Sequence, residues 1–225
     1  MADFPYALEP ALQQHLARVI DAEGKIPRAL EALGPLAGRD VVLVDGAAGI
    51  RARQIQAAGA RLVVLALDAG RPASPLRDLE REGTSVRAGT ALDTGLEPAT
   101  ADVLVACWSS FRGPDPDELR EAARVLRPGG RLLVVHDYGR DDVSALRDET
   151  LPEYVSWGRR NGPFLAGGFR IRVVHAWWTF DSLEEGRGLL HEAFGARGDA
   201  LAERMRRPRL SYNVAVYHRT LNGRA

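Results

Sequence analysis

Between residues 40 and 139 the chain alternates short apolar runs with amphipathic segments, and this alternation limits the folds open to it. Segments of helical period follow most of the apolar runs, and glycine or proline separates the two kinds. Strands that are apolar nearly throughout are typical of a parallel sheet covered on both faces. In such sheets, ligands bind beyond the carboxyl ends of the strands. The expected strands lie at 40–46, 60–68, 84–89, 101–108 and 130–139.

The segments before and after this core are expected to pack onto it. Residues 8–22 and 26–34 carry apolar residues at helical spacing on either side of Gly24, which predicts two N-terminal helices. After the core, residues 141–149 suggest a short helix. Residues 151–168 are rich in aromatics, arginine and glycine, and we expect a loop there.

The C-terminal part predicts a strand, a helical region and a final strand. Residues 169–180 read as a long strand, and Ser182 with Glu185 three residues later forms a capping-box signature. Helix is expected from there through Met205, followed by a strand at 210–220. An antiparallel pair of this kind can complete the same sheet. We therefore expect one domain over 1–225, with N-terminal helices in 1–35, a cofactor-binding core in 36–140, and a substrate-side loop with closing strands in 141–225.

The composition is that of a soluble globular protein and argues against several partners. Lysine and arginine total 30, as do aspartate and glutamate, so the zero net charge provides no general attraction to nucleic acid or to membranes. The single cysteine, Cys107, lies in an apolar run, which favours a buried and inert thiol. No signal peptide or membrane-spanning run is visible, so a cytoplasmic location is expected. The sequence leaves open whether the chain forms a homodimer.

Residues 118–135, ELREAARVLRPGGRLLVV, form the most recognisable motif of the chain. Pro128 ends a helix, Gly129 and Gly130 allow a tight reversal, and an apolar strand follows. This segment resembles the helix–turn–strand of class I S-adenosylmethionine-dependent methyltransferases, and the last part of the chain resembles an uncharacterised bacterial subset of them. The resemblance implies a Rossmann-like α/β fold, in which a seven-stranded and mostly parallel sheet ends with an antiparallel strand and carries helices on both faces.

The resemblance implies an S-adenosylmethionine site that begins at the turn after the first strand. The turn is Asp45-Gly46-Ala47-Ala48-Gly49, with two glycines where the family has three. Glycines in this turn let the backbone approach the methionine part of the cofactor. Asp45, Gly46, Ala48 and Gly49 are therefore the expected cofactor contacts of this turn.

The family also places an acidic residue after the second strand and another after the third. Asp68, two residues beyond the family position, would accept hydrogen bonds from the ribose hydroxyls. Thr90 stands where the third strand's acid is expected, with Asp93 three residues on, and Thr90 and Ala91 would lie near the adenine. A threonine hydroxyl accepts a hydrogen bond more weakly than a carboxylate does.

Candidate catalytic groups follow the fourth and fifth strands. Methyl transfer is an in-line displacement at a sulfonium, for which the protein mainly positions the reactants and a base helps when the acceptor carries a proton. Trp108 would either stack on a ring or cap the core. His136 or Tyr138 is the candidate base, with Asp137 orienting it, and a structural histidine at the strand end is the alternative for His136. No further ligands at matching spacing accompany His136 and Asp137, so no metal is expected.

Two other groups of residues each have a functional and a structural interpretation. A lid built from part of 151–168 would suit a planar or anionic small-molecule substrate, whereas a loop packed by its own aromatics is the structural alternative. The basic run RMRRPR at 204–209 lacks interleaved aromatics, which favours a solvated helix end over nucleic-acid binding. His175 alternates with apolar residues, which favours a position on a sheet face. The lid residues are Tyr154, Trp157, Arg159, Arg160 and Phe164.

Three functions are compatible with these patterns. The first is methyl transfer from S-adenosylmethionine to a small molecule. The second is a cofactor-free or inactive methyltransferase-like domain with a binding or regulatory role, because three cofactor positions depart from the family pattern. The third is an NAD-dependent oxidoreductase, since a strand followed by a glycine turn and a helix also suits a dinucleotide.

Overall fold

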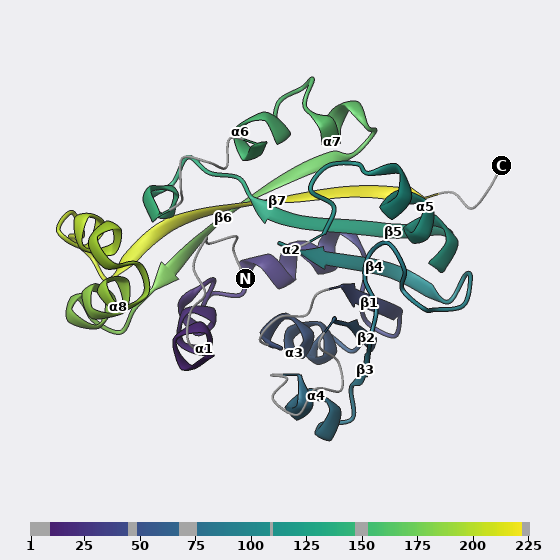
Figure 1. Ribbon diagram of the computed structural model, residues 1–225, viewed down its shortest axis with the longest axis horizontal. Helices are drawn as coiled ribbons and strands as arrows, with labels where there is room; N and C mark the ends of the chain where they lie inside the picture. Colours follow the sequence, from purple (N-terminus) through teal and green to yellow (C-terminus); the bar gives the residue numbers. More distant parts are fainter. Residues whose placement is uncertain (1–9, 45–48, 68–75, 109, 147–152, 222–225) are drawn as a thin grey trace.

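The computed structural model describes residues 10–44, 49–67, 76–108, 110–146 and 153–221, which form a seven-stranded sheet with helices on both faces (Figure 1). The strand order is β3-β2-β1-β4-β5-β7-β6. Neighbours from β3 to β5 pair in parallel, and β7 is antiparallel to both β5 and β6. This confirms the predicted mostly parallel sheet with an antiparallel final strand. The strands are β1 (Asp40–Val44), β2 (Arg61–Leu65), β3 (Ser85–Arg87), β4 (Ala101–Cys107), β5 (Leu126–Asp137), β6 (Arg170–Thr179) and β7 (Arg209–Leu221).

The helices divide between the two faces, and each face has its own apolar core. One core contains side chains from α1 (Pro10–Val19), α2 (Lys25–Leu33), α3 (Ile50–Ala57), α4 (Arg77–Arg81), the 3-10 helix η1 (Asp142–Leu146) and α8 (Leu183–Ala202). The other contains side chains from α5 (Pro116–Val125), α6 (Glu153–Trp157) and α7 (Pro163–Ala166). Strands β1 and β4 and residues 132–135 of β5 are apolar nearly throughout, as expected for strands that are covered on both sides.

The helix before the RPGG segment ends at Val125, three residues before the predicted end at Pro128, and Pro128 lies inside β5. Helix α5 begins at the N-cap Asp115, whose carboxylate accepts from the backbone N–H groups of Asp117 and Glu118. Leu126 pairs with Ala101, and pairing resumes between Arg131 and Val103, so the residues between form a bulge. Gly129 in this bulge has φ 81°, which favours glycine.

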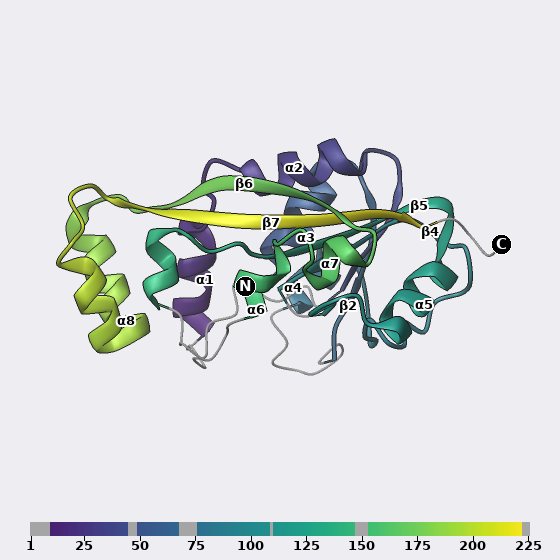
Figure 2. The same ribbon diagram turned by 90° about the horizontal axis from the view of Figure 1, so that it is seen from above.

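Strands β6 and β7 form a long antiparallel ribbon that extends past the parallel strands, and α8 packs at its far end (Figure 2). The predicted N-terminus of α8 is confirmed, because the Ser182 hydroxyl accepts from Glu185 N at 3.0 Å. The Glu185 carboxylate accepts from Asp181 N at 2.8 Å and contacts His15 of α1 at 2.7 Å. One capping glutamate therefore also connects the N-terminal helix to α8.

The region predicted as a loop at 151–168 contains α6 and α7, so that prediction was wrong for its described part. Short helices of this kind depend on tertiary packing because they are too short to be stable alone. Here Tyr154, Trp157 and Phe164 are all buried against the sheet. The short helix expected at 141–149 is the 3-10 helix η1.

An arginine network ties the amino ends of the parallel strands together, at the edge opposite to the expected site. Asp40 of β1 pairs with Arg61 at 2.6 Å and with Arg127 at 2.8 Å. Arg127 also pairs with Asp102 of β4 at 3.0 Å. The hydrogen bond from Arg61, assisted by Arg127, lowers the pKa of Asp40 against the opposing effect of desolvation. These arginines therefore stabilise the sheet and leave the carboxyl edge for function.

Candidate functional site

The candidate site is the carboxyl edge of the sheet near β1, where the strand order reverses. From β1 the chain passes to β2 and β3 on one side and returns to β4 on the other, which is where ligands bind in open α/β sheets. Of the predicted cofactor contacts, Asp45, Gly46, Ala48 and Asp68 lie outside the described residues. Gly49 is buried with φ 71° and ψ −9°, a left-handed conformation that favours glycine. The second glycine of the turn therefore stands at a position that needs it.

Thr90 and Ala91 follow β3 at the same edge. The Thr90 hydroxyl oxygen accepts from Leu92 N at 3.2 Å and from Asp93 N at 3.1 Å. Thr90 N in turn donates to Asp93 O at 2.8 Å, so the backbone and the side chain of Thr90 both stabilise the turn at 90–93. Ala91 is buried in the core. The acid in this loop is Asp93, which is exposed.

Two leucines that the sequence analysis did not single out are the exposed large hydrophobic residues of the described chain. Leu67 is 78% exposed and Leu92 is 59% exposed. They follow β2 and β3, which are parallel neighbours, so both lie at the carboxyl edge. Exposed leucines on adjacent strand ends provide apolar surface for a flat ring.

The sequence carries a signal for these leucines, because the same motif occurs twice. Residues 66–70 read ALDAG and residues 91–95 read ALDTG. In both, the alanine is buried and the leucine is exposed. In both, an aspartate follows the leucine. The two strand ends therefore present a leucine and then an acid in the same order.

Trp108, at the end of β4, belongs to a buried polar network. Its ring N–H donates to Asp137 Oδ1 at 3.0 Å, and the Tyr212 hydroxyl donates to the same oxygen at 2.5 Å. Asp137 and Tyr212 are fully buried. The Arg51 guanidinium lies 5.5 Å from the centre of the Trp108 ring, within cation–π range. The network joins β4, β5, β7 and the first turn of α3 at the switch point.

Arg51 also connects this network to the N-terminal helices. Arg51 Nη1 lies 3.8 Å from Asp21 Oδ2. The Asp21 carboxylate accepts from Lys25 N at 2.8 Å and from Ile26 N at 2.7 Å, which caps α2. The turn between α1 and α2 therefore packs beside the predicted cofactor turn. Sequence reasoning missed Arg51, although an arginine at the second residue of the helix that follows a glycine turn is a recognisable signal.

Backbone strain concentrates at this edge. Five described residues other than glycine have positive φ, and four of them, Asp21, Trp108, Phe111 and Arg140, lie on loops at the carboxyl edge. The φ of Trp108 is 57°, a conformation that costs of order 1–2 kcal/mol for such a residue. Strain of this kind persists where the surroundings enforce it, and it clusters at functional sites.

The predicted base candidates lie on the other face of β5 from Asp137. His136 is fully buried, and its Nε2 lies 3.0 Å from Phe111 O. Its ring is 4.8 Å from that of Trp157. Tyr138 is half-buried beside the turn at Gly158. The structure therefore does not group Asp137 with these two side chains, because successive residues of a strand point to opposite faces.

The predicted lid aromatics form a packed cluster rather than an open wall. Trp157 lies 4.8 Å from Tyr154 and 5.6 Å from Phe164, measured between ring centres. Arg159 and Arg160 are exposed. This arrangement matches the structural alternative, in which the segment is packed by its own aromatics.

Cys107 and His175 both have surroundings that indicate a structural role. Cys107 is buried as expected, and burial raises the pKa of its thiol to about 11, so the reactive thiolate is scarce at neutral pH. His175 is exposed on β6, and its Nδ1 lies 2.7 Å from the Asn213 side-chain oxygen. Within the described ranges, no three acidic, histidine or cysteine side chains group as metal ligands. No helix in the described part of the chain could cross a membrane.

Comparison with known proteins agrees with this fold. Residues 31–134 match a family model described as a methyltransferase domain. The YcgJ protein of Bacillus subtilis is 14% identical, with a TM-score of 0.53, over 90% of this chain and 100% of that one. An Aquifex aeolicus SAM-dependent methyltransferase is 15% identical, with a TM-score of 0.55, over 96% of this chain and 100% of that one. The chain therefore has the Rossmann-like fold of class I S-adenosylmethionine-dependent methyltransferases, and residues 31–134 match a methyltransferase domain.

A ligand-bound structure shares the fold as well. Phosphoethanolamine N-methyltransferase 2 of Haemonchus contortus, in complex with phosphomonomethylethanolamine and S-adenosylhomocysteine, is 16% identical with a TM-score of 0.54. The match covers 88% of this chain and 52% of that one. At such identities the likeness concerns the fold. No curated protein sequence matches the chain.

Proposed function

We propose that this protein transfers a methyl group from S-adenosylmethionine to a small molecule, with the cofactor at the carboxyl ends of β1, β2 and β3. The observation that carries the proposal is the exposure of Leu67 and Leu92 on neighbouring strand ends. The left-handed Gly49 of the preceding turn supports it. Apolar surface beside a glycine turn suits a cofactor with a flat ring at one end and a charged chain at the other.

The residues have different roles in the proposed site. The turn that ends at Gly49 lets the backbone approach the methionine part of the cofactor. Leu67 and Leu92 lie against the adenine ring, while Asp68 and Asp93 accept hydrogen bonds from the ribose and the adenine amino group. When bound, S-adenosylmethionine supplies a methyl group on a positively charged sulfur.

The protein's catalytic contribution is mainly positioning. The bonds from Trp108 and Tyr212 to Asp137 fix the ends of β4, β5 and β7, next to which the acceptor binds. A buried and strained Trp108 provides a rigid, apolar wall that excludes water. His136 has no exposed surface, so a role for it as a base requires that the aromatics of α6 move aside. Tyr138, which is partly exposed, is the better placed of the two candidates.

One measurement distinguishes methyl transfer from the two alternative functions. A dinucleotide oxidoreductase is disfavoured because β7 is inserted antiparallel between β5 and β6, whereas the dinucleotide folds have the strand order 3-2-1-4-5-6. A cofactor-free domain has the same sheet but no affinity for the cofactor. Thermal unfolding with S-adenosylmethionine, S-adenosylhomocysteine and NAD distinguishes all three.

The expected result is a rise in melting temperature with both sulfur compounds and none with NAD. A ligand at about 100 times its Kd stabilises the folded state by about 2.7 kcal/mol. Asp68→Asn and Asp93→Asn should each reduce the shift, whereas Asp78→Asn, an exposed acid on α4, should leave it unchanged. A shift with NAD alone would indicate an oxidoreductase, and no shift with any of the three compounds would mean that the domain is cofactor-free.

A further inference from the structure

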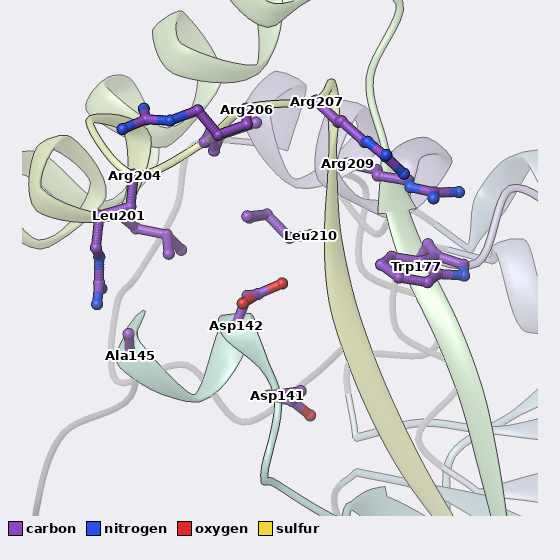
Figure 3. Close-up of a pocket in the computed structure, with 11 residues that line it drawn as sticks. Asp141, Asp142, Ala145, Trp177, Leu201, Arg204, Arg206, Arg207, Arg209 and Leu210 are labelled. Atoms are coloured by element: carbon purple, nitrogen blue, oxygen red, sulfur yellow. The ribbon is translucent and has the colours of Figure 1, made fainter.

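A pocket lies at the end of the β6–β7 ribbon where β6 ends and β7 begins. It has a volume of about 420 Å³, within the range of small-molecule sites. Its apolar lining consists of Ala145, Trp177, Leu201, Met205 and Leu210. Four arginines and two aspartates complete it, namely Arg204, Arg206, Arg207, Arg209, Asp141 and Asp142 (Figure 3). We call it the arginine pocket.

The aspartates of the pocket are engaged by neutral hydrogen-bond donors. Asp142 Oδ2 accepts from Ser211 N at 2.8 Å and from its hydroxyl at 2.7 Å. Asp141 accepts from Asn213 N at 2.7 Å and from Ser144 N at 2.8 Å. These bonds hold η1 against β7. The two carboxylates therefore have a structural role, and among the described residues no ion pair joins either of them to the four pocket arginines.

The arginines of the pocket differ in what they bind. Arg204 Nε donates to Ala200 O at 3.2 Å, and Arg206 Nη1 donates to Glu203 O at 3.0 Å, as cations at helix C-termini do. Within the described chain, no carboxylate lies within ion-pair distance of Arg207 or Arg209. This contrasts with the paired arginines at the opposite edge of the sheet.

Arg207 and Arg209 are held on one rigid turn. Arg209 N donates to Arg207 O at 2.8 Å across Pro208, whose ring fixes the backbone between them. Pro208 O accepts from Phe180 N at 2.9 Å, which anchors the turn to the end of β6. Figure 3 shows the two side chains extending in the same direction, with Arg209 over Trp177. The Arg209 guanidinium lies 4.3 Å from the centre of the Trp177 ring, which orients it.

We propose that the arginine pocket binds the phosphate group of a small phosphate monoester, clamped by Arg207 and Arg209, with the organic part of the ester beside the Trp177 ring. Two guanidiniums on one turn match a dianion in charge, and their planar donors suit phosphate oxygens. A nucleic acid is disfavoured because two carboxylates line the pocket and the chain has no net charge.

The pocket lies on the same edge of the sheet as the proposed methyl-transfer site. Trp177 O accepts from Asp21 N at 2.9 Å, and the Asp21 carboxylate is the one that lies beside Arg51. A ligand held in the arginine pocket would thus border the turn that connects the two sites. The inference does not depend on methyl transfer, since phosphate binding is measured without the cofactor.

Calorimetric titration of the full chain with phenyl phosphate at about 50 mM salt tests the pocket. We expect saturable binding that weakens as salt screens the charges. Arg207→Gln and Arg209→Gln should each weaken it about tenfold, the equivalent of about 1.4 kcal/mol for one charge-assisted hydrogen bond. Arg187→Gln, an exposed arginine of α8 outside the pocket, should leave it unchanged.

The controls separate this inference from its rivals. Arg207→Gln breaks no described side-chain contact, so its circular dichroism and melting temperature should match those of the unchanged protein, as should its affinity for S-adenosylhomocysteine. Equal phenyl phosphate binding by the Arg207, Arg209 and Arg187 variants would overturn the inference. So would tighter binding of uncharged phenol, or a single-stranded oligonucleotide that binds more tightly and competes for the same arginines.

Discussion

Truncation of the two exposed leucines tests the cofactor site most directly. Leu67→Ala and Leu92→Ala each remove three carbon atoms, worth about 2.4 kcal/mol if fully buried, at roughly 0.8 kcal/mol per carbon group. Only the surface that is exposed in the free protein can be newly covered by a ligand. With exposures of 78% and 59%, the upper limits are about 1.9 and 1.4 kcal/mol of binding free energy. These correspond to about twentyfold and tenfold losses in affinity.

Stability should respond differently from affinity. An exposed leucine makes few contacts in the free protein, so each truncation should change the free energy of unfolding by less than about 0.5 kcal/mol. Calorimetric titration with S-adenosylhomocysteine measures the affinity, and urea unfolding of the free protein measures the stability. The expected pattern is a clear loss of affinity at nearly unchanged stability.

Leu67→Met and Leu92→Met are the matched controls. Methionine keeps most of the apolar area and adapts its shape, so affinity should stay within about twofold of the original. The reasoning fails if both alanine variants bind as tightly as the unchanged protein. It also fails if the methionine variants lose as much affinity as the alanine variants, because apolar area would then not be the cause.

Three further predictions concern stability. Trp108→Phe keeps an aromatic ring but removes part of the indole, including the N–H that bonds to buried Asp137, so urea unfolding should show a loss of about 1.5–3 kcal/mol. The absence of any loss would show that the bond contributes nothing. Gly49→Ala and Gly38→Ala both place alanine at a φ near 70°, and each should lower the free energy of unfolding by about 1–2 kcal/mol. Gly49→Ala alone should reduce the affinity for S-adenosylhomocysteine. Equal affinities of the two variants would refute the role of the turn. The bond from Arg124, with help from Thr94, lowers the pKa of Glu121 to about 2, against 4.5 for the free group. Because the pKa of Glu121 is lower in the folded state, the stabilisation is complete above about pH 4.5 and is lost as the pH falls toward 2. Glu121→Gln should therefore reduce the pH dependence of the free energy of unfolding in that range. An unchanged pH dependence would count against the assignment.

Much of the fold followed from local patterns in the sequence. The central strands are largely apolar, and the Pro-Gly-Gly segment that follows the end of α5 contains a glycine with positive φ. Ser182 and Glu185 form the predicted cap. These signals are readable because each depends on a few residues close together in the chain.

The contacts within the site were less predictable because they join distant segments. Tyr212 reaches Asp137 across 75 positions, and Asp21 reaches Arg51 across the first strand. The helices α6 and α7 were missed because their stability comes from burying aromatics against the sheet. The alternation of side chains along β5, by contrast, would have shown that His136 and Asp137 point to opposite faces.

The repeated ALD motif bears on whether the departures from the family pattern represent decay of the cofactor site. Asp68 and Asp93 both lie beyond the positions that the family pattern gives, and both follow an exposed leucine. Random loss would remove the two acids independently and would not leave the same order of buried alanine, exposed leucine and acid on neighbouring strands. The glycine at the strained position of the first turn is also retained. Acids displaced by two and by three residues, together with apolar surface at both strand ends, are compatible with the proposed cofactor site.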